Sequence, residues 1–144
     1  MRRQDIDTYR ELKISTMNQK ELIVFLYDSA IKLIISAKEK IVSKDVTGRQ
    51  ADLNRARNIF LHLLATLDLE AGGEFARKLS ALYAFFIEKI TVANATESAR
   101  ELDEITPMIE DIKSAWESAK FQEEPASVVS EKSVEAARTV SLEV

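Results

Sequence analysis

The stretch NQKELIVFLYDSAIKLII, residues 18–35, decides the fold class. It begins with a helix-capping signal, because the Asn18 side chain is suited to bind the free amides of a first helical turn and Glu21 completes a capping box. The pattern predicts a first helix that ends near Ser43–Asp45. Its apolar residues recur in steps of three and four, the period of an α-helix: Leu22, Leu26, Ala30, Leu33, Ala37 and Ile41.

Three more helices follow along the chain. The second covers roughly Thr47–Leu67, the third about Glu74–Ala93 and the fourth about Glu97–Ala119, each with an apolar seam at helical spacing. We expect Asn94–Thr96 to close the third helix, with its threonine as the cap of the fourth. Pro107 lies inside the fourth seam, so we expect a kink there or two shorter helices.

Helices of this length joined by short turns pack as antiparallel neighbours. The expected fold is therefore all-α, an antiparallel up-down four-helix bundle over residues 18–119, preceded by a short N-terminal segment, residues 1–17. Residues 120–144 hold five acidic and three basic residues, and Val134, Ala137 and Ser141 give them only a thin apolar face. These last residues are predicted to form a flexible acidic tail that the fold does not need.

Composition excludes several classes of protein. The chain has 144 residues with 20 basic and 24 acidic side chains, a net charge of -4, whereas nucleic-acid binding calls for a basic surface. The longest apolar runs, residues 22–27 and 81–87, are shorter than the ~18–20 residues of a membrane span. Charged residues also occupy the positions after Met1 where a signal peptide has its apolar run. We expect a cytoplasmic protein with no nucleic-acid partner and no membrane span.

The sequence offers no catalytic or metal-binding constellation. Cysteine is absent, which removes thiolate chemistry and zinc–thiolate sites. His62 is the one histidine, and no carboxylate stands three or four residues from it on the predicted helix. Phosphate-binding glycine loops and nucleophile-elbow motifs are also missing. The prediction is a protein that is not an enzyme and holds neither metal nor cofactor.

Two of the predicted helices carry more apolar residues than a bundle needs. Residues 22–35 hold eleven apolar residues, although about six would face neighbouring helices. Residues 75–93 hold thirteen apolar residues among nineteen. Two interpretations stay open. The helices lie in the middle and are contacted on several sides, or part of their surface forms an open groove for another chain. A dimer interface would use the same surplus.

Several motifs, in order over residues 9–119, resemble the family of the flagellar secretion chaperone FliS. Residues 26–31, LYDSAI, are similar to the family's L-Y-D-G-A-I, and residues 16–22, TMNQKEL, to its T-A-S-P-E-K-L. Residues 67–76 are similar to its L-D-x-x-x-G-G-E-x-A turn. Further matches are Tyr9, Ile14, Leu82, Tyr83, Asn94 and Trp116, and the departures are Gln19 for proline, Ser29 for glycine, and Pro107.

The resemblance implies an antiparallel helical bundle that binds the disordered C-terminal segment of flagellin in the cytoplasm. Such a chaperone prevents premature polymerisation and assists flagellar type III secretion, and its partners extend to the export apparatus and other flagellar regulators. The alternative function is a general helical adaptor or dimerising bundle with another protein client. The candidate client-binding residues are Tyr9, Ile14, Leu22, Ile23, Leu26, Tyr27, Ile31, Leu82, Tyr83 and Phe86.

The N-terminal segment has its own predicted role. Tyr9 and Ile14 are apolar residues in a polar leader. We expect this segment to lie near the client groove when no partner is bound and to move aside when one arrives. Tyr9 would then act as a movable lid, held by the roughly 1.5–3 kcal/mol that burying a large side chain contributes.

Overall fold

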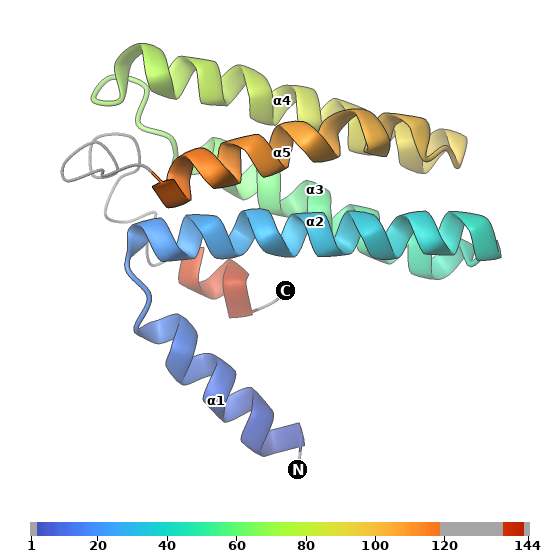
Figure 1. Cartoon of the computed structure of the whole chain (residues 1–144), viewed down its shortest axis with the longest axis horizontal. Coiled ribbons are helices and arrows are strands. Elements are labelled where there is room, and N and C mark those ends of the chain that lie inside the picture. The colour runs from blue at the N-terminus through green and yellow to red at the C-terminus, as the bar shows by residue number, and fades with distance from the viewer. Residues whose placement is uncertain (1–2, 119–136, 143–144) are drawn as a thin grey trace.

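The computed structural model describes residues 3–118 and 137–142, and all of the regular structure in these two ranges is helical (Figure 1). Its first helix, α1, precedes the predicted bundle, and residues 137–142 form a further helical segment without a label. The labelled helices are α1 (Arg3–Ser15), α2 (Gln19–Ser43), α3 (Val46–Thr66), α4 (Gly73–Thr96) and α5 (Arg100–Ser118).

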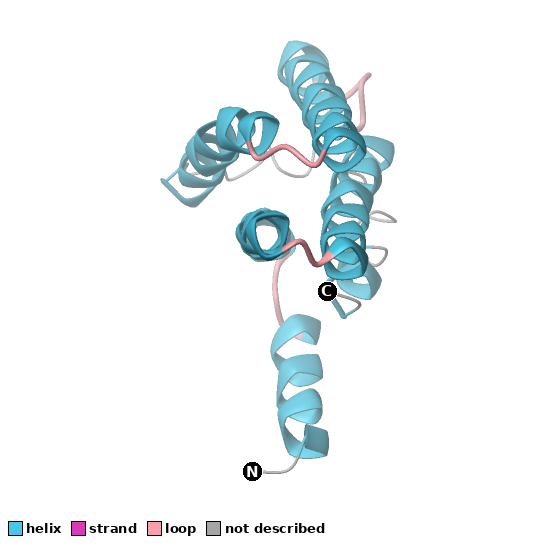
Figure 2. Cartoon of the chain, turned by 90° about the vertical axis from the view of Figure 1, so that its right-hand side faces the viewer, coloured by secondary structure: helices cyan, strands magenta, loops and turns pink. Residues whose placement is uncertain are grey.

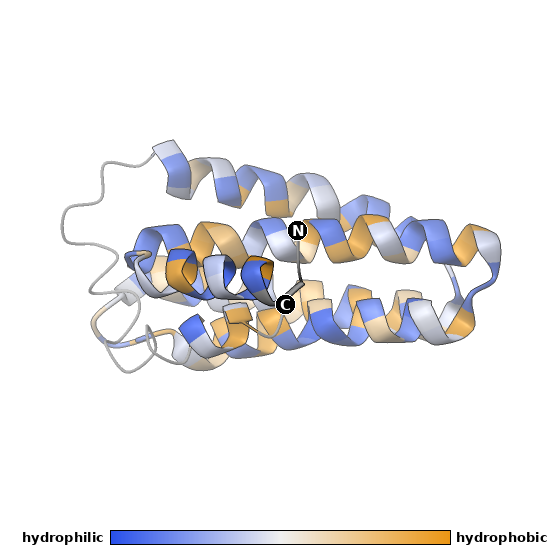
Figure 3. Cartoon of the chain, turned by 90° about the horizontal axis from the view of Figure 1, so that it is seen from below, coloured by the Kyte–Doolittle hydropathy of each residue, from blue (hydrophilic) through white to orange (hydrophobic). Residues whose placement is uncertain are grey.

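Helices α2 to α5 form the expected antiparallel four-helix bundle, so the predicted fold class is confirmed. Helix α2 packs against α3 and α5, and α4 packs against the same two helices. The end-on view shows α1 projecting away from the bundle (Figure 2). Hydrophobic and hydrophilic residues alternate along the helices, as expected when each buries one face (Figure 3).

The start of α2 has the predicted capping box. The Glu21 amide donates to Asn18 Oδ1 at 2.8 Å, and the Asn18 amide donates to Glu21 Oε1 at 3.2 Å. The helix ends where Lys44 adopts a left-handed conformation, with φ of 62°. Asp45 then caps α3 by accepting a hydrogen bond from the Gly48 amide at 3.0 Å.

The predicted boundary between the last two helices is wrong by three residues. Helix α4 continues through Thr96, whose hydroxyl donates to the Val92 carbonyl at 2.8 Å instead of capping the next helix. Glu97 ends α4 in a left-handed conformation, with φ of 55°. The Ser98 hydroxyl accepts from the Arg100 amide at 3.2 Å, so the serine takes the role that the threonine was expected to have.

Helix α5 is continuous across Pro107, so the expectation of two shorter helices is wrong. Proline has no amide hydrogen, and the Asp103 carbonyl therefore loses its donor within the helix. The ring is exposed, while Ile105 and Ile109 on either side are fully buried. Packing of the buried face keeps the helix in one piece despite the lost hydrogen bond.

Both terminal segments contain helix. Most of the N-terminal segment, residues 1–17, forms α1, in which Ile14 is 1% exposed and Tyr9 is 68% exposed. Of the predicted flexible tail, residues 137–142 are helical and bury Ala137 and Ser141. These two small residues lie four positions apart on one helix face, which permits close packing. The remainder of the predicted tail lies outside the described residues.

No helix in the described part of the chain is long and apolar enough to cross a membrane.

At the end of the bundle far from α1, charged side chains are buried between helices. Arg49 of α3 donates to Asn94 Oδ1 at 3.2 Å and to Glu97 Oε1 at 2.8 Å, which joins α3 to the end of α4. Lys40 of α2 donates to the buried Asp52 at 2.8 Å.

Candidate functional site

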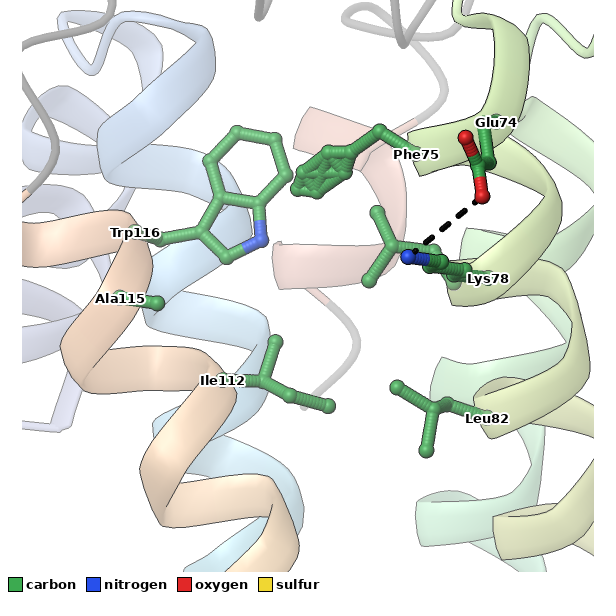
Figure 4. A pocket seen from close by; sticks show the side chains of 8 residues that line it. Glu74, Phe75, Lys78, Leu82, Ile112, Ala115 and Trp116 are labelled. Carbon is green, nitrogen blue, oxygen red and sulfur yellow. Dashed lines mark ion pairs between the residues drawn. The ribbon is translucent and has the colours of Figure 1, made fainter.

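An apolar groove runs between the start of α4 and the last turns of α5 (Figure 4). We call it the α4/α5 groove. Its volume is about 470 Å³, within the range of cavities that hold ligands or peptide side chains. Its lining residues are Glu74, Phe75, Lys78, Leu79, Leu82, Ile112, Ala115 and Trp116.

Two pairs of side chains face each other across this groove. Phe75 and Trp116 have ring centroids 6.3 Å apart and ring planes tilted by 44°. Leu82 and Ile112 form the second pair (Figure 4). Leu82 lies two helical turns after Phe75 on α4, and Ile112 lies one turn before Trp116 on α5. Trp116 is almost fully buried, whereas Phe75 remains 38% exposed. The groove therefore offers an apolar wall that an incoming side chain can cover.

The rim of the α4/α5 groove is charged. Lys78 Nζ lies 3.6 Å from Glu74 Oε1, and both side chains are largely exposed. An exposed pair one helical turn apart contributes little to stability. An apolar wall with a polar rim suits an amphipathic helix, which places apolar residues at positions i, i+3, i+4 and i+7 in such a groove.

A hydrogen-bonded tyrosine pair lies in the core next to the groove. The hydroxyls of Tyr27 and Tyr83 are 2.5 Å apart, and both side chains are buried. Burial and then the neighbouring Tyr83 raise the pKa of Tyr27 well above its ordinary value. Burial likewise raises the pKa of Tyr83. Both hydroxyls therefore stay protonated at physiological pH, and the pair is a neutral link between α2 and α4.

A second groove lies on the other side of α5, against α2. We call it the α2/α5 groove, and its volume is also about 470 Å³. Here Lys113 Nζ lies 3.2 Å from Asp28 Oδ1, while Lys32 Nζ lies 3.0 Å from Asp28 Oδ2. Its lining residues are Met17, Lys20, Glu21, Val24, Phe25, Asp28, Lys113 and Glu117.

The Asp28 carboxylate joins the two helices that form this second groove. Partial burial raises the pKa of its carboxyl, but the hydrogen bonds from Lys32 and Lys113 outweigh burial and hold the pKa below its ordinary value. Asp28 is therefore ionised at neutral pH and ties α5 to α2. The α2/α5 groove is more polar than the α4/α5 groove, and its lining includes two lysines, Lys20 and Lys113.

The structure separates the residues that the sequence nominated for client binding. Leu82 lines the α4/α5 groove, whereas Tyr9 is exposed on α1 and is not among the residues that line either groove. The other eight are buried at 7% exposure or less, so in this conformation a client has no direct access to them. Their role in binding stays a prediction. These eight are Ile14, Leu22, Ile23, Leu26, Tyr27, Ile31, Tyr83 and Phe86.

Sequence reasoning did not nominate Phe75, Ile112, Trp116 or Phe25 as site residues. A usable signal was present, because Phe75, Leu79 and Leu82 are spaced by four and three residues and so share one face of α4. Ile112 and Trp116 are likewise four apart on α5. The spacing does not say which of these side chains a neighbouring helix covers, and only packing decides that. Among the described residues, no three His, Cys, Asp or Glu side chains cluster as a metal site would require.

Comparisons with known proteins place the chain among flagellar proteins. The sequence profile of the family "Flagellar protein FliS" matches residues 2–123. The chain is 32% identical to the flagellar secretion chaperone FliS of Salmonella typhimurium, over 78% of this chain and 87% of that protein. It is 30% identical to the Vibrio cholerae chaperone of the same name, over 73% of this chain and 77% of that protein. It is 26% identical to the Bacillus subtilis chaperone of that name, over 77% of this chain and 82% of that protein. The region matched by the profile contains both grooves.

Proposed function

This chain belongs to the FliS family of flagellar secretion chaperones, and from that premise we propose that it binds the C-terminal segment of flagellin in the cytoplasm. Binding keeps flagellin from polymerising before export and presents it to the flagellar type III secretion apparatus. The observation that carries the proposal is the α4/α5 groove, an open and mainly apolar groove of about 470 Å³ between two helices of the bundle.

A flagellin segment that is disordered when free loses conformational entropy on binding. Ordering such a segment costs roughly 2–5 kcal/mol or more. At about 25 cal/mol per Å² of apolar surface, burial of about 200 Å² offsets the upper end of that cost. One groove covers only a few side chains, so we infer that the client uses both grooves that flank α5.

The two facing pairs of the α4/α5 groove suit the apolar face of a client helix. Phe75 with Trp116, and Leu82 with Ile112, are successive contact points along the groove. Client side chains one and two helical turns apart would pack between them. Lys78 and Glu74 at the rim would face the polar side of the same helix. Apolar faces of flagellin that are meant for neighbours in the filament would then be covered.

Calorimetric titration with a peptide from the flagellin C-terminus tests this proposal. The variant is Phe75→Ala, and the matched control is Leu61→Ala, because Leu61 is 44% exposed on α3, which is not packed against α5. Phe75 at 38% exposure leaves about 75 Å² of a ring of about 200 Å² for a client to cover. That area corresponds to about 2 kcal/mol, or a Kd about thirtyfold weaker.

Phe75→Ala is expected to weaken binding by this factor, while Leu61→Ala leaves the Kd unchanged. Equal affinities for both variants and the parent chain would contradict the assignment of the groove. The dimerising-bundle alternative is distinguished by sedimentation of the chain alone. A stable dimer that Phe75→Ala converts to a monomer, without any binding of the flagellin peptide, would replace the chaperone proposal with that alternative.

A further inference from the structure

The helical segment formed by residues 137–142 contacts the opposite end of the chain. The Arg10 guanidinium on α1 donates to the Ser141 carbonyl at 3.0 Å. In return, the Arg138 guanidinium donates to the Met17 carbonyl, in the turn between α1 and α2, at 2.9 Å. Each segment thus supplies one arginine to a main-chain carbonyl of the other, and Figure 1 shows the two lying on the same side of α2.

Burial shows that this contact is a packed one. Ala137 is 6% exposed and the Ser141 side chain is fully buried, and Ala137 belongs to the main apolar cluster of the bundle. On α1, Ile14 is 1% exposed, whereas Ile6 and Tyr9 further from α2 are 50% and 68% exposed. Helix α1 is therefore anchored towards its C-terminal end, while residues 5–9 near its start are exposed.

We propose that the junction of α1 and α2 is a docking surface whose occupant is the chain's own C-terminal segment, residues 137–142, and that this clasp fixes the direction in which α1 leaves the bundle. The FliS profile matches residues 2–123, so one partner of this contact, residues 137–142, lies outside the matched region. The proposal does not depend on flagellin binding.

Geometry and charge explain why a clasp is needed and what holds it. Only residues 16–18 separate α1 from α2, and helix α1 has no extensive packing against the bundle helices. Without a further contact, α1 would pivot about this short turn. Hydrogen bonds from a guanidinium are stronger than neutral ones, and the guanidinium stays charged at any physiological pH. The clasp is therefore expected to hold across that whole pH range.

One buried atom weakens the clasp. Ser141 Oγ is buried and has no hydrogen-bond partner among the described residues. An unsatisfied buried hydroxyl opposes packing. Ser141→Ala is accordingly expected to tighten the docking of residues 137–142, opposite in sign to the effect of removing either arginine.

Hydrogen exchange on the full-length chain tests the proposal. Arg138→Ala and Arg10→Ala are each expected to speed amide exchange in both residues 10–17 and residues 137–142 by about tenfold, the factor for losing one charge-assisted hydrogen bond. Ser141→Ala is expected to slow exchange in the same two stretches. Arg55→Ala, which removes an exposed arginine from α3, is the matched control and should alter neither stretch.

The direction of α1 is measured separately by the distance between two spin labels. Because the chain has no cysteine, Glu11→Cys and Glu39→Cys provide two unique exposed sites, on α1 and α2. We expect a narrow distance distribution that becomes broad when Arg138→Ala is added. Unchanged exchange and an unchanged distribution in both arginine variants would overturn the proposal. Exchange protection of residues 137–142 that falls on dilution would also overturn it, because the segment would then dock on a second copy.

Discussion

Removal of one hydroxyl from the Tyr27–Tyr83 pair tests whether the hydrogen bond between these two buried side chains stabilises the fold. In Tyr83→Phe, the Tyr27 hydroxyl loses its 2.5 Å partner and remains buried beside Trp116. In Tyr27→Phe, the Tyr83 hydroxyl likewise loses its partner and remains buried. In the double variant, neither hydroxyl remains.

The magnitudes follow from the burial of the pair, because both side chains are at most 2% exposed. Leaving one buried hydroxyl without its partner costs about 1–3 kcal/mol, whereas replacing both partners with apolar groups of similar shape is close to neutral. Each single variant leaves one buried hydroxyl without its partner, so we expect Tyr83→Phe and Tyr27→Phe each to cost about 1–2 kcal/mol in the free energy of unfolding. The double variant should cost less than the two single variants together, with a coupling of about 1 kcal/mol or more.

Urea unfolding followed by far-UV circular dichroism measures all four chains, with Tyr9→Phe as the control because Tyr9 is exposed. The single variants should also lower Tm by about 3–5 °C per kcal/mol for a domain of this size. Additive single effects would refute the reasoning, since they would mean that the two hydroxyls do not depend on each other.

Three further predictions concern single residues. Pro107→Ala is expected to stabilise the fold by about 1 kcal/mol, because alanine restores an amide that can donate to the Asp103 carbonyl, and the exposed proline contributes no core packing; a lower Tm would contradict this. Asp28→Asn is expected to destabilise the chain at neutral pH and to lose this effect in acid. The folded-state pKa of Asp28 lies below its ordinary value of 3.8, so its contribution is present above that value and disappears as the pH falls through the folded-state pKa. Thermal melts of both chains from neutral pH to below 3.8 check this, and a Tm difference that persists at the acid end would disprove it. Tyr9→Ala is expected to change the free energy of unfolding by less than about 0.5 kcal/mol, because the side chain is 68% exposed. If α1 is a movable lid, Tyr9→Ala binds the flagellin peptide as tightly as the parent chain or more tightly. A Kd that calorimetry finds tenfold weaker or worse than that of the parent chain would contradict the lid hypothesis.

Helix periodicity was sufficient to predict the bundle, because its signals are local. Asn18 and Glu21 form the predicted cap, and the apolar steps of three and four residues gave the four helices to within a few residues. The wrong boundary at the end of α4 arose because two capping candidates lie two residues apart. Thr96 bonds back to its own helix, and Ser98 two residues later caps the next one. Only the positions of both helices decide between them.

The candidate site was harder to predict, because an apolar side chain looks the same in a sequence whether it is buried or open. Tyr27 and Tyr83 lie in the motifs that carried the family resemblance, yet they pair with each other in the core. Phe75 lies on the same face as Leu82 but near the end of its helix, where no neighbour covers it completely. In residues 137–142 the buried side chains are Ala137 and Ser141, and because both are small the apolar face they form looks too thin in the sequence to predict packing. Long-range packing, invisible to local spacing, accounts for each of these differences.

Co-purification with flagellin tests the central claim most directly. The full chain is expressed with flagellin, and in parallel with flagellin that lacks its C-terminal segment. We predict a stoichiometric complex with the first and none with the second, and a weaker complex when the chain carries Phe75→Ala. Equal recovery of both flagellins, or of neither, would contradict the claim that this bundle is a chaperone for the flagellin C-terminus.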